Sequence, residues 1–183
     1  MEFRTIGLIE LNSVALGILA ADEMLKASNV DLIMARPACP GRYLAMVAGE
    51  IGAVQNSVDV GRAAGADLVV DYFVLANVHP DVIPALTAAT PLARMGALGV
   101  LETYTAASAI MAADAAAKAA EVELLEVRCS TGLAGKSYFT LTGDVGSVQA
   151  AMEAALDALA DSGVVLAKAI IPAPSPELVK CIA

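Results

Sequence analysis

The chain contains an internal repeat, and this repeat limits the possible folds more than any other feature of the sequence. Residues 49–55 (GEIGAVQ) return as residues 143–149 (GDVGSVQ). In each copy an apolar run ends at a glycine, an acidic residue follows, and a segment with helical periodicity begins. That order is typical of a strand, a tight turn and a helix N-terminus. The 183 residues therefore predict two domains of roughly 90 residues each, a size that can form its own core.

The two halves also share one order of expected elements. In the first half we expect strands at 5–11, 29–36, 43–48 and 67–78, and helices at 13–27 and 50–64, with Gly65 as a C-cap and a short helix after His79. The second half repeats this order, and the separation between matching residues grows along the chain. It is 92 residues before the loop at 129–136, 94 residues after that loop and 96 residues at the C-terminal end. The β-α-β-β-α-β order predicts an α+β fold with two tandem ferredoxin-like domains, each an antiparallel four-stranded sheet with its helices on one face. We place the domains at 1–91 and 95–183, with a linker at 90–96.

Composition excludes several classes of protein. Hydrophobic residues make up 58% of the chain and the mean hydropathy is +0.69. No uncharged stretch reaches the ~18 residues of a membrane span, so we expect the apolar surface to be buried between subunits. The net charge of −9 argues against nucleic acid as a partner. Three cysteines and a start without a signal pattern indicate a reducing cytoplasm.

Several of these residues carry a resemblance to a known family. Residues 7–10 (GLIE), Lys26, residues 49–55 and residues 171–174 (IPAP) resemble the bacterial microcompartment shell domain, here in tandem. Residues 39–43 (CPGRY) and 75–79 (LANVH) are similar to the tandem-domain shell proteins of propanediol-utilisation compartments. The resemblance implies a structural protein rather than an enzyme. It implies a homotrimer whose six domains mimic a hexamer and which tiles with other shell proteins into the facets of a compartment in the cytoplasm.

The loop that contains Cys39 is the candidate metal site. The resemblance implies that Cys39 of three chains holds one 4Fe-4S cluster per trimer, which passes electrons across the shell to or from a redox protein. Chemistry offers independent support, because thiolates hold iron-sulfur clusters and Cys-Pro is a recurring context for their ligands. From the residues alone, Cys39 is more often a loop thiol that binds no metal, and the cluster is favoured only by the resemblance. We expect Arg42 and Lys136 to offset the negative charge of the thiolates. The residues expected to line the central pore are Ala38, Pro40 and Gly41 in the first half and Gly132, Leu133, Ala134 and Gly135 in the second.

The resemblance also implies an edge through which one tile meets the next. Lys26 and Lys118 occupy the position of the edge lysine in the two halves. The shell domain usually has an arginine where this chain has Asn77 and Ala173, so we expect weaker tiling. Without the resemblance, the two lysines are ordinary solvated side chains.

Other candidate residues favour structural roles. We expect Cys129 and Cys181 to be packing thiols and His79 to cap or pack beside its turn. Residues 132–136 (GLAGK) indicate a plain turn rather than a phosphate site, because no helix is expected to follow them. Two other functions stay open: a shell subunit with a cluster-free pore for a small metabolite, and a soluble trimeric ferredoxin-like sensor that does not form sheets.

Overall fold

The computed structural model describes residues 5–87, 95–160 and 162–182, and divides the chain into two compact units. The first unit extends to Val78 and also contains the loop Ser130–Gly135. The second unit contains His79–Cys129 and continues from Lys136. Most of the expected linker at 90–96 lies outside the described residues. None of the helices in the described ranges is both long and apolar enough to cross a membrane.

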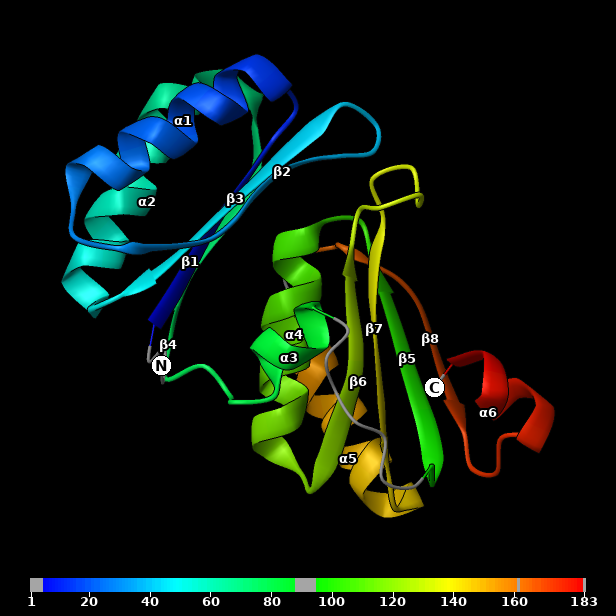
Figure 1. The fold of residues 1–183 in the computed structure, drawn as a ribbon. Helices are drawn as coiled ribbons and strands as arrows, with labels where there is room; N and C mark the ends of the chain where they lie inside the picture. Colours follow the sequence, from blue (N-terminus) through cyan, green and yellow to red (C-terminus); the bar gives the residue numbers. More distant parts are fainter. Residues whose placement is uncertain (1–4, 88–94, 161, 183) are drawn as a thin grey trace. The chain divides into compact units, whose positions relative to one another are not determined.

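The first unit has the predicted β-α-β-β-α-β order (Figure 1). Its strands pair antiparallel in the order β2-β3-β1-β4, and α1 and α2 lie side by side on the sheet. Its elements are β1 (Thr5–Leu11), α1 (Val14–Ala27), β2 (Asp31–Ala38), β3 (Arg42–Gly49), α2 (Ile51–Gly65), a short 3-10 helix (Ala66–Leu68) and β4 (Val69–Ala76).

The second unit repeats the same fold and adds two short helices. Its strands pair antiparallel in the order β6-β7-β5-β8, and α4 packs beside α5. The helix α3 follows β4 in the chain, but it packs within the second unit against β6 and α4 (Figure 1). The elements of this unit are α3 (Val82–Leu86), β5 (Ala97–Thr103), α4 (Ala106–Ala119), β6 (Val122–Cys129), β7 (Ser137–Gly143), α5 (Val145–Asp157), β8 (Val165–Ile171) and α6 (Pro176–Ile182).

Local chemistry explains where α1 starts and why it lies close to the sheet. Asn12 and Ser13 were both candidates for the N-cap of α1, and the structure has Ser13, whose side chain accepts a hydrogen bond from the backbone N of Leu16 at 3.2 Å. A Cβ added at Gly17 would lie 2.3 Å from the Cβ of Tyr43 on β3. Glycine at this position therefore lets α1 approach β3 more closely than any other residue would allow.

Several expected boundaries differ from the structure by one or two residues. The second strand begins at Asp31 rather than at 29, and β4 begins at Val69 because the residues before it form the short 3-10 helix. Gly65 is the last residue of α2 and not its left-handed cap: the positive φ of +46° belongs to Ala66. Gly65 is required instead for space, since a Cβ there would lie 2.5 Å from Cδ2 of Leu11.

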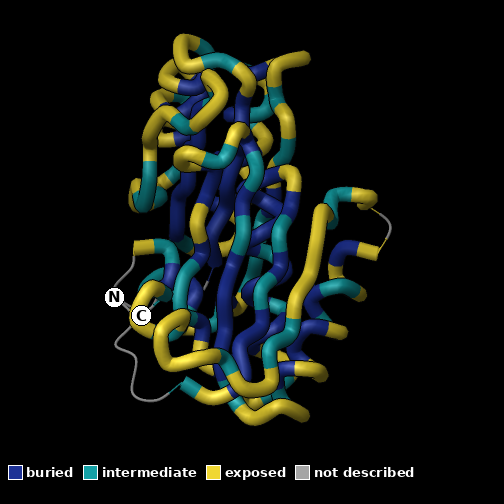
Figure 2. The backbone as a smooth tube through the Cα atoms, turned by 90° about the vertical axis from the view of Figure 1, so that its right-hand side faces the viewer, coloured by how far each residue is buried: buried dark blue, intermediate teal, exposed yellow. Residues whose placement is uncertain are grey.

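The core of the first unit lies between its sheet and its helices. All seven residues of β1 are buried, and so are the central residues of β3. Ile9, Met24, Tyr43 and Val54 belong to one cluster of buried residues that joins the sheet to both helices. The buried residues run along the strands of the chain in Figure 2. Because the core does not include the loop between β2 and β3, that loop is free to carry functional residues.

Candidate functional site

Cys39 lies in the tight connection between β2 and β3. Its side chain is exposed, and its backbone N donates a hydrogen bond to the carbonyl oxygen of Ser130 at 2.9 Å. Gly41, two residues later, has a φ of +76°, which an L-residue with a side chain rarely adopts. The thiol is therefore presented to solvent from a loop whose backbone is held in place.

The loop Ser130–Gly135 packs beside the Cys39 loop within the first unit. Ser130 is buried, and its hydroxyl donates to the carbonyl oxygen of Gly135 at 3.2 Å. A Cβ built on Gly135 would lie 3.1 Å from Cδ of Pro40. The pore-loop residues expected in the first half of the sequence thus lie next to those expected in the second half. The pore-loop residues of this second loop are Gly132, Leu133, Ala134 and Gly135, of which only Leu133 and Gly135 are not exposed.

The backbone of the second loop fits a plain turn better than a phosphate site. Gly132, Ala134 and Gly135 have positive φ angles of +73°, +51° and +89°. The next element is the strand β7, which starts at Ser137. A phosphate loop is followed by a helix whose N-terminal amides face the anion, and here no helix follows.

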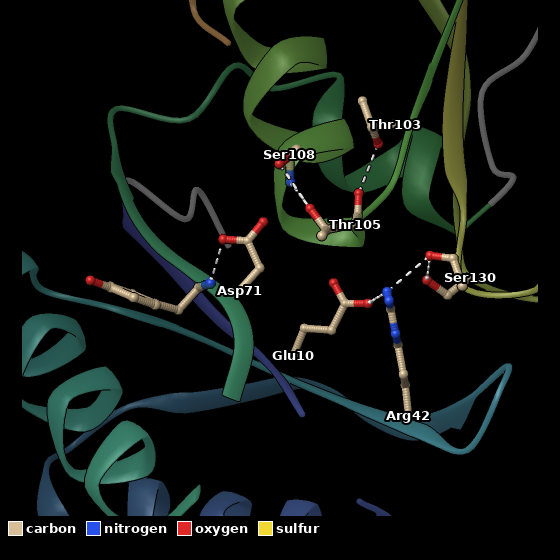
Figure 3. Close-up of polar contacts among 9 residues, drawn as sticks. Glu10, Arg42, Asp71, Thr103, Thr105, Ser108 and Ser130 are labelled. Atoms are coloured by element: carbon tan, nitrogen blue, oxygen red, sulfur yellow. Dashed lines mark hydrogen bonds and ion pairs between the residues drawn. The ribbon is translucent and has the colours of Figure 1, made fainter. Parts of the chain in front are cut away.

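An ion pair between Arg42 and the buried Glu10 connects the two loops to the sheet. The guanidinium Nη1 of Arg42 donates to Oε1 of Glu10 at 2.5 Å and to the carbonyl oxygen of Gly135 at 3.0 Å. The side chain of Glu10 is fully buried, and 18% of the Arg42 side chain is exposed. Figure 3 shows Arg42 between Glu10 on β1 and the loop that starts at Ser130. The guanidinium thus ties β1, β3 and the second loop together.

This ion pair corrects one expectation and adds one residue that the sequence analysis missed. We expected Arg42 to offset the charge of thiolates, but its own positive charge is balanced by Glu10. Glu10 itself was not singled out. The signal for it was an acid within the apolar run of β1, repeated as Glu102 at the same place in the second half.

The other two cysteines have different surroundings. Cys129, the last residue of β6, is fully buried, so the prediction of a packing thiol is confirmed for it. The same prediction is wrong for Cys181 in the single chain, because this thiol is exposed on α6, where it approaches the carbonyl oxygen of Glu177 at 3.5 Å. Cys39 and Cys181 are thus the two accessible thiols among the described residues.

The two edge lysines have similar partners but different exposure. Lys26 binds Asp22 one turn earlier on α1, and this hydrogen bond, followed by the carboxylate charge, raises the pKa of Lys26. Lys118 binds Asp114 on α4 at 2.5 Å. The side chain of Lys26 is 65% exposed and that of Lys118 is 38% exposed, so both side chains are at least partly accessible to solvent.

His79 and Asn77 occupy the turn after β4. The backbone N of His79 donates to Oδ1 of Asp114 at 2.7 Å, and its ring Nδ1 accepts from the backbone N of Asp81 at 3.4 Å. These contacts fit the expected capping role. Asn77 is exposed with a φ of +51°, a conformation that Asn tolerates better than most residues.

Comparison with known proteins assigns the fold of both halves. The BMC domain family matches residues 5–78 and 97–174. The bacterial microcompartment shell protein PduT of Citrobacter freundii is 38% identical over 171 residues, which cover 93% of each chain. A crystal structure of a microcompartment protein from Desulfitobacterium hafniense DCB has 48% identity and a TM-score of 0.89, and the match covers 98% of this chain and 100% of that one. A fused permuted hexameric shell protein from the RMM microcompartment has 26% identity and a TM-score of 0.65, with 85% of this chain and 80% of that one covered.

Proposed function

Because this chain belongs to the BMC domain family and is a structural shell protein of a bacterial microcompartment, we propose that three copies form a ring of six shell domains. Such a pseudohexamer is a flat tile for the facets of the shell. The main support is that one chain carries two complete copies of the same domain, so three chains supply six. As a shell component the protein works in the cytoplasm beside other shell proteins and is not an enzyme. The family also makes a soluble sensor the weaker interpretation.

We predict that sedimentation velocity gives one species of three times the 18.5 kDa chain mass. The physical reason is the apolar surface that the single chain leaves exposed, such as Ile18 at 55% and Leu32 at 48%. Burial of such side chains contributes about 25 cal/mol per Å². A single species at the mass of one chain at micromolar concentration would contradict the trimer.

Tiling through the edge lysines leads to a second prediction. Restoring the family arginine by Ala173→Arg should let sheets form at a protein concentration about tenfold lower, because one hydrogen bond to a charged donor contributes about 1.5–3 kcal/mol. Lys26→Ala should raise that concentration. Electron microscopy of negatively stained sheets measures both effects, and Glu123→Ala, an exposed change on β6, is the control. If neither variant changes the threshold, the edge lies elsewhere.

The pore of the proposed trimer is the place for the iron-sulfur cluster. Cys39 is an accessible thiol in a loop with a held backbone, whereas Cys129 is buried and cannot reach a shared ligand. No group of three metal-binding side chains gathers within the described part of one chain, so the site would need thiols from several chains. Three copies of Cys39 around a three-fold axis would supply three thiolates to a 4Fe-4S cluster. When bound, such a cluster carries single electrons.

We propose that the cluster passes electrons across the shell between the lumen and a redox protein outside it. The residues of this chain would present the thiol and exclude bulk water from the three-fold axis. Arg42 would hold the loop in place. Anaerobic reconstitution with iron and sulfide, followed by a visible absorbance spectrum and iron analysis, tests the proposal. A trimer that binds no iron would instead favour a cluster-free pore for a small metabolite.

A further inference from the structure

Within the second unit, the helix α3 covers a surface formed by β6 and α4. Val82 and Ala85 of α3 are fully buried. The backbone N of His79, just before α3, donates to Oδ1 of Asp114, and the Asp114 side chain is only 4% exposed. Segment 79–86 is therefore docked by apolar contacts and by one hydrogen bond to a buried carboxylate.

The first unit presents the matching surface uncovered. Asp22 is the repeat equivalent of Asp114, and its side chain is 53% exposed. Ile18 is 55% exposed, whereas its equivalent Ile110 is fully buried. Leu32 on β2 and Leu124 on β6 differ in the same way, at 48% and 0%. At these three positions the surface of α1 and β2 has the same residues as that of α4 and β6, but the chain leaves them exposed.

The chain also contains an unused copy of the docking segment. Residues 175–182 match 79–86 at a separation of 96, which aligns Ser175 with His79, Leu178 with Val82 and Cys181 with Ala85. No residue of α6 is buried, and Leu178 is 39% exposed. Leu178 is apolar and Cys181 carries a thiol, and side chains of these two types are usually buried in folded proteins.

We propose that α6 of one copy docks on the α1 and β2 surface of a second copy, in the way that α3 docks on α4 and β6. The backbone N–H of Ser175 would donate to Asp22 of the other copy, and Leu178 and Cys181 would be buried against it. A second copy is the occupant because the single chain leaves both surfaces exposed. The inference rests on the proposed trimer. A head-to-tail contact repeated three times closes a ring when each copy is rotated by one third of a turn from the last, so this docking would be the contact between neighbouring chains.

This docking is compatible with the proposed tile edge. Asp114 already accepts from His79 while its neighbour Lys118 keeps 38% of its side chain exposed. By the same geometry, Asp22 would bind Ser175 while Lys26 stays accessible to another tile. The exposed Cys181 is also explained, because its equivalent Ala85 is a packing residue.

A cysteine pair tests the contact directly. In a Cys39→Ala/Cys181→Ala background, oxidised Asp22→Cys/Ser175→Cys should run as covalent dimers and trimers on a non-reducing denaturing gel, and either single cysteine should not. The matched control is His79→Cys/Asp114→Cys, whose disulfide forms within one chain and consumes two thiols without a change in mass. If sedimentation shows a trimer and the first pair stays at the mass of one chain, the docking is wrong and the trimer survives. A wild-type monomer would contradict both.

A second measurement does not depend on disulfide geometry. Asp22→Ala should raise the dissociation constant of the trimer about tenfold or more, the effect of losing a hydrogen bond to a charged acceptor. Glu23→Ala is the matched control on the same helix, since its repeat equivalent is already an alanine, Ala115. Equal dissociation constants for Asp22→Ala and the wild type would overturn the inference.

Discussion

Cys39→Ser is expected to remove all bound iron from protein reconstituted anaerobically with iron and sulfide, and to leave the trimer intact. A serine hydroxyl stays protonated near neutral pH and is a poor ligand for iron, whereas a thiol ionises readily when it binds metal. The trimer should survive because the Cys39 side chain is exposed and lies outside the core of the first unit. Iron per chain, the visible absorbance and the sedimentation coefficient together measure this result.

The other two cysteines provide controls for this experiment. Cys181→Ala should retain the iron, because this thiol lies on α6 and not in the loop. Cys129→Ala should also retain it, at a cost in stability of about 1 kcal/mol for the loss of a buried sulfur. Iron retained by Cys39→Ser would show that another residue is the ligand. Wild-type trimer that takes up no iron would leave the metabolite pore as the better interpretation.

The repeat made most of the fold predictable from the sequence. Matching residues in the two halves occupy matching places: Ser13 and Thr105 are the N-caps of α1 and α4, and each accepts a hydrogen bond from the backbone N three residues later. The order of strands in the sheets follows from the β-α-β-β-α-β pattern, because such a connection leaves few ways to pair the strands. Local patterns of this kind determine local structure directly.

Interactions between distant residues were harder to predict. Glu10 and Arg42 are 32 positions apart, and nothing in the local pattern of either residue indicates that they meet. The docking of α3 on the second unit was missed for the same reason, since a five-residue helix shows where it starts but not where it packs. The packing role expected for Cys181 on α6 was wrong in the single chain for a related reason. Apolar character indicated burial, and the single chain does not bury it.

Arg42→Ala is expected to lower the free energy of unfolding by about 3–5 kcal/mol, the usual cost of removing one partner from a buried ion pair. The Glu10 carboxylate is fully buried, so Arg42→Ala removes the cation that lies beside a charge with no exposure to water. The variant also loses the hydrogen bond to the carbonyl oxygen of Gly135 that ties the second loop to β3. Urea unfolding at one fixed protein concentration measures the change, since subunit association contributes to the stability of an oligomer.

Two variants separate the ion pair from a general effect of losing an arginine. Arg36→Ala removes an exposed arginine from β2 and should change the unfolding free energy by no more than about 0.5 kcal/mol. Glu10→Met/Arg42→Met should recover most of the stability lost in Arg42→Ala, because apolar side chains of similar size replace both charges and leave neither one buried alone. If the double variant is less stable than Arg42→Ala, the hydrogen bond to Gly135 and the order of the loop contribute more than the charge pair. A loss below about 1 kcal/mol in Arg42→Ala would mean that water reaches Glu10 and that the pair does not anchor the loops.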